Sequence, residues 1–196
     1  GNVVNRNDKE GICLDQGALG NYVALNRFQG NGNRARQTDR DLRKDFVLDH
    51  GRMPDGSARA KLPAVSLDNA AYNILVHNTL QGNFGGGVKI VRTGVRNLIG
   101  QNLIVNCNEG QNDLFHYFGI ELGSAPGDAA SESLDYTPCL ENTVFSNVIQ
   151  GPHSAGIYIG RGGYRNDLFD NVILGATVYA LECVSEKPNA ALNNVS

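Results

Sequence analysis

Short stretches of alternating apolar and polar residues recur along the chain, each opened by an asparagine that a second asparagine follows five residues later. Apolar residues lie between and after the two asparagines, and a glycine or a small polar residue closes each stretch. This short alternation predicts β-strands, because the spacing of the apolar residues is not helical. The clear copies are Asn21–Gly30, Asn73–Gly82, Asn97–Asn106, Asn142–Gly151 and Asn166–Gly175, and a weaker copy begins at Asn189.

The distance between copies indicates how the strands assemble. Copies are 24 residues apart from Asn73 to Asn97 and from Asn142 to Asn166, and 23 residues apart from Asn166 to Asn189. The two other distances, 52 and 45 residues, fit one such repeat plus an inserted loop. A repeat of this length cannot bury its apolar face alone, so the copies are expected to stack into a solenoid.

Each repeat also contains a short strand of the form small–apolar–any–apolar. Side chains alternate in a strand, so its second and fourth residues are expected in the core and its third and fifth on the outer face. Three residues before the strand lies a further column that includes His116 and His153, which should lie on adjacent coils. The predicted strands are Gly11–Asp15, Ala64–Asp68, Gly87–Val91, Gly119–Gly123, Gly156–Gly160 and Ala180–Val184. The outward columns are Cys13, Ser66, Lys89, Glu121, Tyr158 and Glu182, and then Asp15, Asp68, Val91, Gly123, Gly160 and Val184.

The repeat resembles the right-handed parallel β-helix proteins of the pectate-lyase-like superfamily, in particular the parallel β-helix repeats of carbohydrate-binding and sugar-hydrolase proteins. The resemblance implies an all-β solenoid of about six coils, in which stacked asparagine amides form a ladder along the axis. Identical amides at the strand spacing of about 4.8 Å can hydrogen-bond to one another, and asparagine tolerates tight turns. A leucine-rich repeat is the alternative, but it needs leucines at fixed positions, and these repeats use Val, Ile, Phe and Leu interchangeably.

Composition narrows the classes of partner. The 196 residues are of single-domain length, and a formal net charge of −3 argues against nucleic acid or an anionic membrane. No apolar run reaches the length of about 18 residues that a membrane span needs. Because both ends fall inside a repeat, we expect residues 1–196 to be one domain of a longer β-helix chain, with further coils as partners. The four cysteines, Cys13, Cys107, Cys139 and Cys183, follow no metal-ligand spacing and are expected to be buried or idle thiols, with a disulfide as the alternative.

Three insertions interrupt the repeats, at about residues 31–62, 107–117 and 125–138. The first two precede the small–apolar strand and the third follows it, so all three should flank its outer face. Long loops over a rigid scaffold commonly carry binding and catalytic residues, and members of the resembled superfamily bind polysaccharide along this face. In the alternative interpretation the loops cap the solenoid or contact other parts of the protein.

Candidate catalytic residues converge on this face from three consecutive coils. Cutting a uronic-acid polysaccharide by β-elimination needs a cation to neutralise the carboxylate, a base for the C5 proton and an acid for the leaving oxygen. In the alternative interpretation Lys89 and Glu121 form an ordinary surface ion pair. The candidates are Lys89 or Arg161 as the cation, His116 or His153 as the base and Tyr158 as the acid, with Glu121 beside them.

Asp15 and Asp68 form a competing site, because the register stacks them on adjacent coils. Stacked strands would hold the two carboxylates about 5 Å apart, the separation of a retaining glycosidase pair. Alternatively they share a cation such as Ca²⁺, or merely begin turns. The candidate chemistry requires no other cofactor. Arg92 and Tyr117 are expected to contribute to substrate binding.

Two classes of function follow from these residues and the resemblance. The first is a carbohydrate-active enzyme, a lyase or a glycoside hydrolase, that cleaves a polysaccharide along this face and is secreted, periplasmic or on the cell surface. The second is a non-catalytic β-helix, such as an adhesin, a phage fibre or a surface protein. The chain has no motif of the pectate lyases, of the polygalacturonases with their clustered aspartates or of the alginate epimerases with their Asp-Pro-His-Asp sequence. No catalytic residue therefore carries over from those enzymes.

Overall fold

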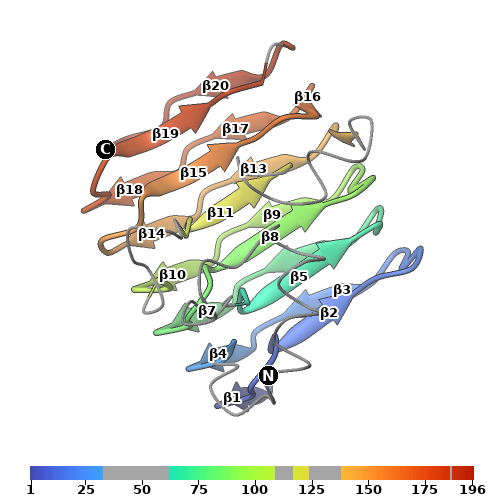
Figure 1. Cartoon of the computed structure of the whole chain (residues 1–196), viewed down its shortest axis with the longest axis vertical. Helices are drawn as coiled ribbons and strands as arrows, with labels where there is room; N and C mark the ends of the chain where they lie inside the picture. The colour runs from blue at the N-terminus through green and yellow to red at the C-terminus, as the bar shows by residue number, and fades with distance from the viewer. Residues whose placement is uncertain (33–61, 109–116, 124–137, 186) are drawn as a thin grey trace, which may run out of the picture.

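The computed structural model describes residues 1–32, 62–108, 117–123, 138–185 and 187–196. Over these ranges the chain is a right-handed parallel β-helix with three parallel sheets of six strands, stacked coil upon coil (Figure 1). Each full coil contributes one strand to every sheet, because strands that are neighbours in a sheet come from successive repeats of the sequence. The predicted solenoid of about six coils is confirmed.

The three sheets are named here in the order in which the chain visits them within a coil. The first sheet contains β2 (Ile12–Leu14), β5 (Val65–Asp68), β8 (Val88–Val91), β11 (Ile120–Leu122), β15 (Ala155–Ile159) and β19 (Tyr179–Cys183). The second contains β3 (Tyr22–Ala24), β6 (Ile74–Val76), β9 (Leu98–Gly100), β13 (Thr143–Phe145), β17 (Asp167–Phe169) and β20 (Ala190–Leu192). The third contains β1 (Val3–Asn5), β4 (Arg27–Gln29), β7 (Thr79–Gln81), β10 (Leu103–Val105), β14 (Val148–Gln150) and β18 (Val172–Leu174). A short pair, β12 (Cys139–Leu140) and β16 (Gly163–Tyr164), lies between the first and second sheets along the chain.

The core is a stack of apolar layers, since each coil turns one or two side chains of every strand inward. On the coil that begins with β8, Ile90, Ile99 and Ile104 enter from the three sheets, and each is fully buried. The first sheet follows the predicted alternation, with its second and fourth residues inside at Val88 and Ile90. Lateral stacking of such layers provides the apolar burial that no single coil has alone.

Two asparagine ladders mark the corners on either side of the second sheet. Each rung except the last of its ladder donates its backbone N–H and its Nδ2 to the Oδ1 of the asparagine on the next coil. Asn102 does so to Asn147 at 3.0 Å in both bonds. The resemblance implied a ladder only at the corner between the second and third sheets, and that ladder is present. The first ladder is Asn21, Asn73, Asn97, Asn142, Asn166 and Asn189, and the second is Asn2, Asn26, Asn78, Asn102, Asn147, Asn171 and Asn194.

The residue before most rungs turns the chain. With the exceptions of Gly1 before Asn2 and Pro188 before Asn189, it has a positive φ, as at Arg96 (53°) and Ser146 (50°), and the asparagine then follows at the corner. A left-handed backbone costs a non-glycine residue about 1–2 kcal/mol. The hydrogen bonds of the buried amide that follows offset this cost, which explains why the corner tolerates many residue types at the first position and few at the second.

The four cysteines are free thiols, two exposed and two buried. None of the described residues forms a helix long and apolar enough to cross a membrane.

Candidate functional site

The outward column of the first sheet has the predicted register. Lys89 lies beside Ser66 on one side and beside Glu121 on the other, and Glu121 lies beside Tyr158. Tyr158 in turn pairs with Glu182. Candidate groups from three successive coils therefore lie next to one another on β8, β11 and β15, as the sequence predicted.

Lys89 and Glu121 form an ion pair across two coils. Lys89 Nζ lies 3.3 Å from Glu121 Oε1, and their side chains are only 20% and 10% exposed. Removing two charges from water is costly, and a close opposite charge recovers part of that cost. The ion pair that the alternative interpretation expected between these two residues is therefore present. It is more buried than an ordinary surface ion pair.

Tyr158 points outward from β15 and is nonetheless buried, with 1% of its surface exposed. The ring of Phe118 stacks on it, with centroids 4.3 Å apart and planes inclined by 9°. Tyr117 is also buried, and its carbonyl oxygen accepts the backbone N–H of Ser154 on the next coil. Both tyrosines are therefore covered by other parts of the protein.

The exposed charges of the site lie where the strands of the first sheet end. Asp68, the last residue of β5, forms an ion pair with Arg92, which directly follows β8, at 2.7 Å. Asp15 occupies the place equivalent to Asp68 on the preceding coil and is exposed. Arg161 is exposed two residues beyond β15. A Cβ on Gly123, where φ is +87°, would lie 2.8 Å from the Arg161 carbonyl oxygen, so glycine is required for this close approach.

Cys13 shows the electrostatics of the acidic end of the site. Burial and the neighbouring carboxylates of Glu10, Asp15 and Asp68 raise the pKa of its thiol to about 11. The thiol is therefore protonated at neutral pH and is not a nucleophile. Among the described residues, no group of three or more His, Cys, Asp or Glu side chains is placed to hold a metal ion. Sharing of Ca²⁺ by Asp15 and Asp68 stays a prediction, and Asp68 already has Arg92 as its partner.

His153 lies elsewhere than the sequence interpretation placed it. It is fully buried in the corner after the third sheet, where its Nε2 accepts the backbone N–H of Cys107 at 3.1 Å. Burial lowers the pKa of its imidazole to about 4. This position makes His153 a rung of a third ladder, and its side chain does not reach the outer face of the first sheet. His116, its expected neighbour, lies outside the described residues.

The third ladder contains residue types that the repeat pattern did not single out. Asn7 donates to Asn31, and Asn31 donates to Asn83. Asn83 Nδ2 then donates to Cys107 Sγ at 3.3 Å, and Cys107 donates to His153. The sequence signal for this corner was an asparagine five residues after a rung of the second ladder, as Asn31 follows Asn26 and Asn83 follows Asn78.

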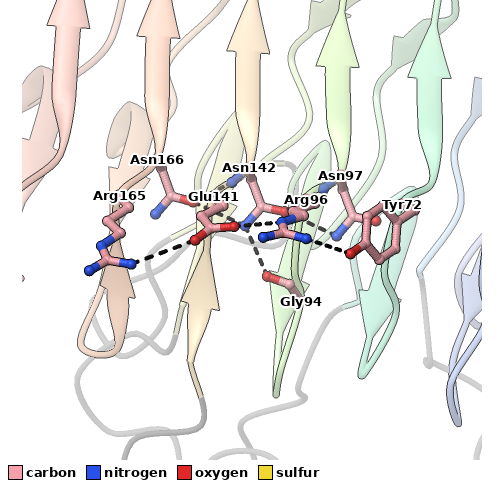
Figure 2. Close-up of polar contacts among 8 residues, drawn as sticks. All are labelled: Tyr72, Gly94, Arg96, Asn97, Glu141, Asn142, Arg165 and Asn166. Carbon is pink, nitrogen blue, oxygen red and sulfur yellow. Dashed lines mark hydrogen bonds and ion pairs between the residues drawn. The ribbon is translucent and has the colours of Figure 1, made fainter.

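A second group of polar residues was missed by the sequence interpretation. Tyr72, Arg96, Glu141 and Arg165 each directly precede a rung of the first ladder, so they lie side by side on four successive coils (Figure 2). We call them the corner row. These four residues have the same spacing along the sequence as the asparagines of the first ladder. A comparison of the positions that directly precede those asparagines would therefore have identified them.

Comparison with known proteins adds information about the fold alone. No protein-family model matches the sequence, and no curated protein matches it. Among solved structures, the chain is similar to the alginate lyase from Paenibacillus sp. str. FPU-7, with 15% sequence identity and a TM-score of 0.53. The match covers 93% of this chain and 55% of that one, so the chain spans about half the length of the lyase. The fold is therefore one that a polysaccharide lyase also uses.

Proposed function

We propose that this chain is the β-helix of a carbohydrate-active protein that cleaves an acidic polysaccharide by β-elimination along the outer face of the first sheet. The observation that carries the proposal is the line of charges on successive coils, from Asp68 and Arg92 to Lys89, Glu121 and Arg161. Arginine pairs with carboxylates in a bidentate manner, which suits a polymer with one carboxylate per sugar. The likeness to an alginate lyase is consistent with this choice of substrate class.

The roles follow from what each group offers. Arg92 and Arg161 are exposed cations and bind substrate carboxylates. Lys89, whose Nζ lies 3.3 Å from Glu121 Oε1, neutralises the carboxylate next to the acidic C5 proton. Tyr158 is the proposed acid for the leaving oxygen, and Phe118 must then move off its ring as substrate binds. His116 is the proposed base. Secretion or display on the cell surface belongs to the same proposal.

The test is a panel of polysaccharides, with alginate and polygalacturonate as acidic members and a neutral glucan as the control. Elimination raises both the ultraviolet absorbance of the unsaturated product and the number of reducing ends, whereas hydrolysis raises reducing ends alone.

Lys89→Gln is expected to lower kcat about a hundredfold, because it removes a charge directed at the developing enolate. Arg27→Gln is the matched control, since Arg27 is exposed on the third sheet and donates to Gln81.

Two results would contradict this assignment. Hydrolysis without elimination would move the chemistry to Asp15 and Asp68, because a glycosidase needs two carboxylates. Absence of both signals would favour the non-catalytic alternative, for which the burial of Tyr158 and the closed Lys89–Glu121 pair are the supporting observations. Tyr158→Phe separates a proton donor from a packing residue, since it removes only the hydroxyl.

A further inference from the structure

The corner row is a continuous set of polar contacts along the solenoid axis. Arg96 Nη1 donates to the Tyr72 hydroxyl at 2.7 Å, and its guanidinium lies 5.6 Å from the centre of the Tyr72 ring. On the other side Arg96 Nε donates to Glu141 Oε2 at 2.6 Å. Arg165 Nη1 lies 3.7 Å from Glu141 Oε1 (Figure 2). The hydrogen bond with Glu141 raises the pKa of Arg96 above its ordinary value.

The four residues of the row share an unusual backbone conformation. All four residues have φ between 53° and 57°, in the left-handed region. Gly20 precedes the first rung of the same ladder with a φ of 66°, so the corner accepts glycine without that strain. In the described ranges, the corresponding residues before the second ladder share no such charge pattern, as Leu25, Gln101 and Ser146 illustrate. Charged and aromatic side chains on four successive coils thus distinguish this corner from the corner of the second ladder.

An apolar strip lies beside the row. Ala71, Val95, Leu140 and Tyr164 each immediately precede a member of the row, stack in register and are half-buried, whereas the residues before them are buried. Lys187 lies over the Tyr164 ring, with Nζ 4.3 Å from its centre. Among the described residues named above, the corner therefore combines an apolar strip with three cations, Arg96, Arg165 and Lys187, and one carboxylate, Glu141.

We propose that this corner is a second, non-catalytic binding site for a linear acidic polysaccharide. Sugar rings have apolar C–H faces that pack on aromatic and aliphatic surfaces, and uronate carboxylates pair with guanidinium groups. Successive coils are about 4.8 Å apart, a step close to the length of one sugar in an extended chain, so a polymer parallel to the axis meets one coil per sugar. Arg165, whose side chain is 68% exposed and whose ion pair is long, is the principal carboxylate ligand.

This site does not depend on the reaction proposed at the first sheet, since it uses none of those residues. The test measures binding of alginate oligosaccharides by calorimetry at low salt, with Lys89→Gln as the background so that turnover does not intervene. Arg165→Gln is expected to weaken binding about tenfold, the effect of one charge-assisted hydrogen bond. Glu141→Gln should strengthen it about threefold, because the competing carboxylate is removed. Arg27→Gln should change nothing.

The same oligosaccharides with their carboxylates reduced to alcohols are the ligand control and should bind at least about tenfold more weakly. The proposal is overturned if Arg165→Gln binds as the background protein does, or if the reduced oligosaccharides bind equally well. In that case the corner row only stabilises the contact between coils. Glu141→Gln would then lower thermal stability without changing the affinity for the oligosaccharides. Because binding is measured directly, a failure of the lyase assignment leaves this result interpretable.

Discussion

The second and third ladders perform the same task with different side chains. The second has asparagine at every described rung, from Asn2 to Asn194. The third begins with asparagines and continues with Cys107 and His153. Each replacement still presents an acceptor to the coil before it, since Sγ accepts an amide N–H of Asn83 and Nε2 accepts the backbone N–H of Cys107. A corner rung therefore needs an acceptor at one place, and asparagine is one way of supplying it.

Loss of a middle rung in the uniform ladder should have the largest effect. Asn147→Ala leaves the backbone N–H and the amide of Asn102 without the acceptor that now lies 3.0 Å away, in a fully buried position. Each unpaired buried group costs about 1–3 kcal/mol, so the free energy of unfolding in urea should fall by about 4 kcal/mol. Asn21→Ala is the control, because Asn21 is a half-buried first rung that donates to Asn73. Equal losses for the two variants would contradict the ladder's role.

The histidine rung should make the third ladder sensitive to pH. Burial lowers the pKa of His153 to about 4 in the folded protein, while an unfolded histidine titrates near about 6.5. As the pH falls through this window the unfolded state takes up the proton first. The contribution of neutral His153 to the free energy of unfolding is therefore fully present above about pH 6.5. It decreases by about 3 kcal/mol as the pH falls towards 4.

His153→Asn places at this rung an asparagine, whose amide takes up no proton in this pH range. Urea denaturation of both proteins across this pH range isolates the histidine, because the carboxylates are common to the two. The difference in unfolding free energy between them should shrink or reverse as the pH rises. Parallel pH profiles would mean that His153 is not the buried neutral rung described here.

The parts of the molecule that the sequence could predict are those that repeat. The asparagine spacing and the alternation of apolar residues fixed the strands, the inward and outward columns and the neighbours of Lys89, because stacking copies the same environment onto every coil. The predicted place of His153 was wrong. His153 follows Asn147 by six residues, whereas Cys107 follows Asn102 by five, so the extra residue in Gly151-Pro152 moves the histidine into the position of the rung. Burial of Tyr158 under Phe118 was also beyond the pattern, because outward direction and exposure are separate properties.

The cysteine rung should respond least to restoring the consensus residue. Cys107 Sγ lies 3.3 Å from the carbonyl oxygen of Leu80, the place where Asn102 Nδ2 meets the carbonyl oxygen of Leu75 in the second ladder. An asparagine at position 107 can therefore adopt the standard rung, and Cys107→Asn should change the free energy of unfolding by less than about 1 kcal/mol. Cys107→Ala removes the acceptor and leaves a small void, so it should cost about 2 kcal/mol. If urea denaturation shows equal losses for both variants, the corner requires the thiol itself, and the equivalence of the two ladders fails at this rung.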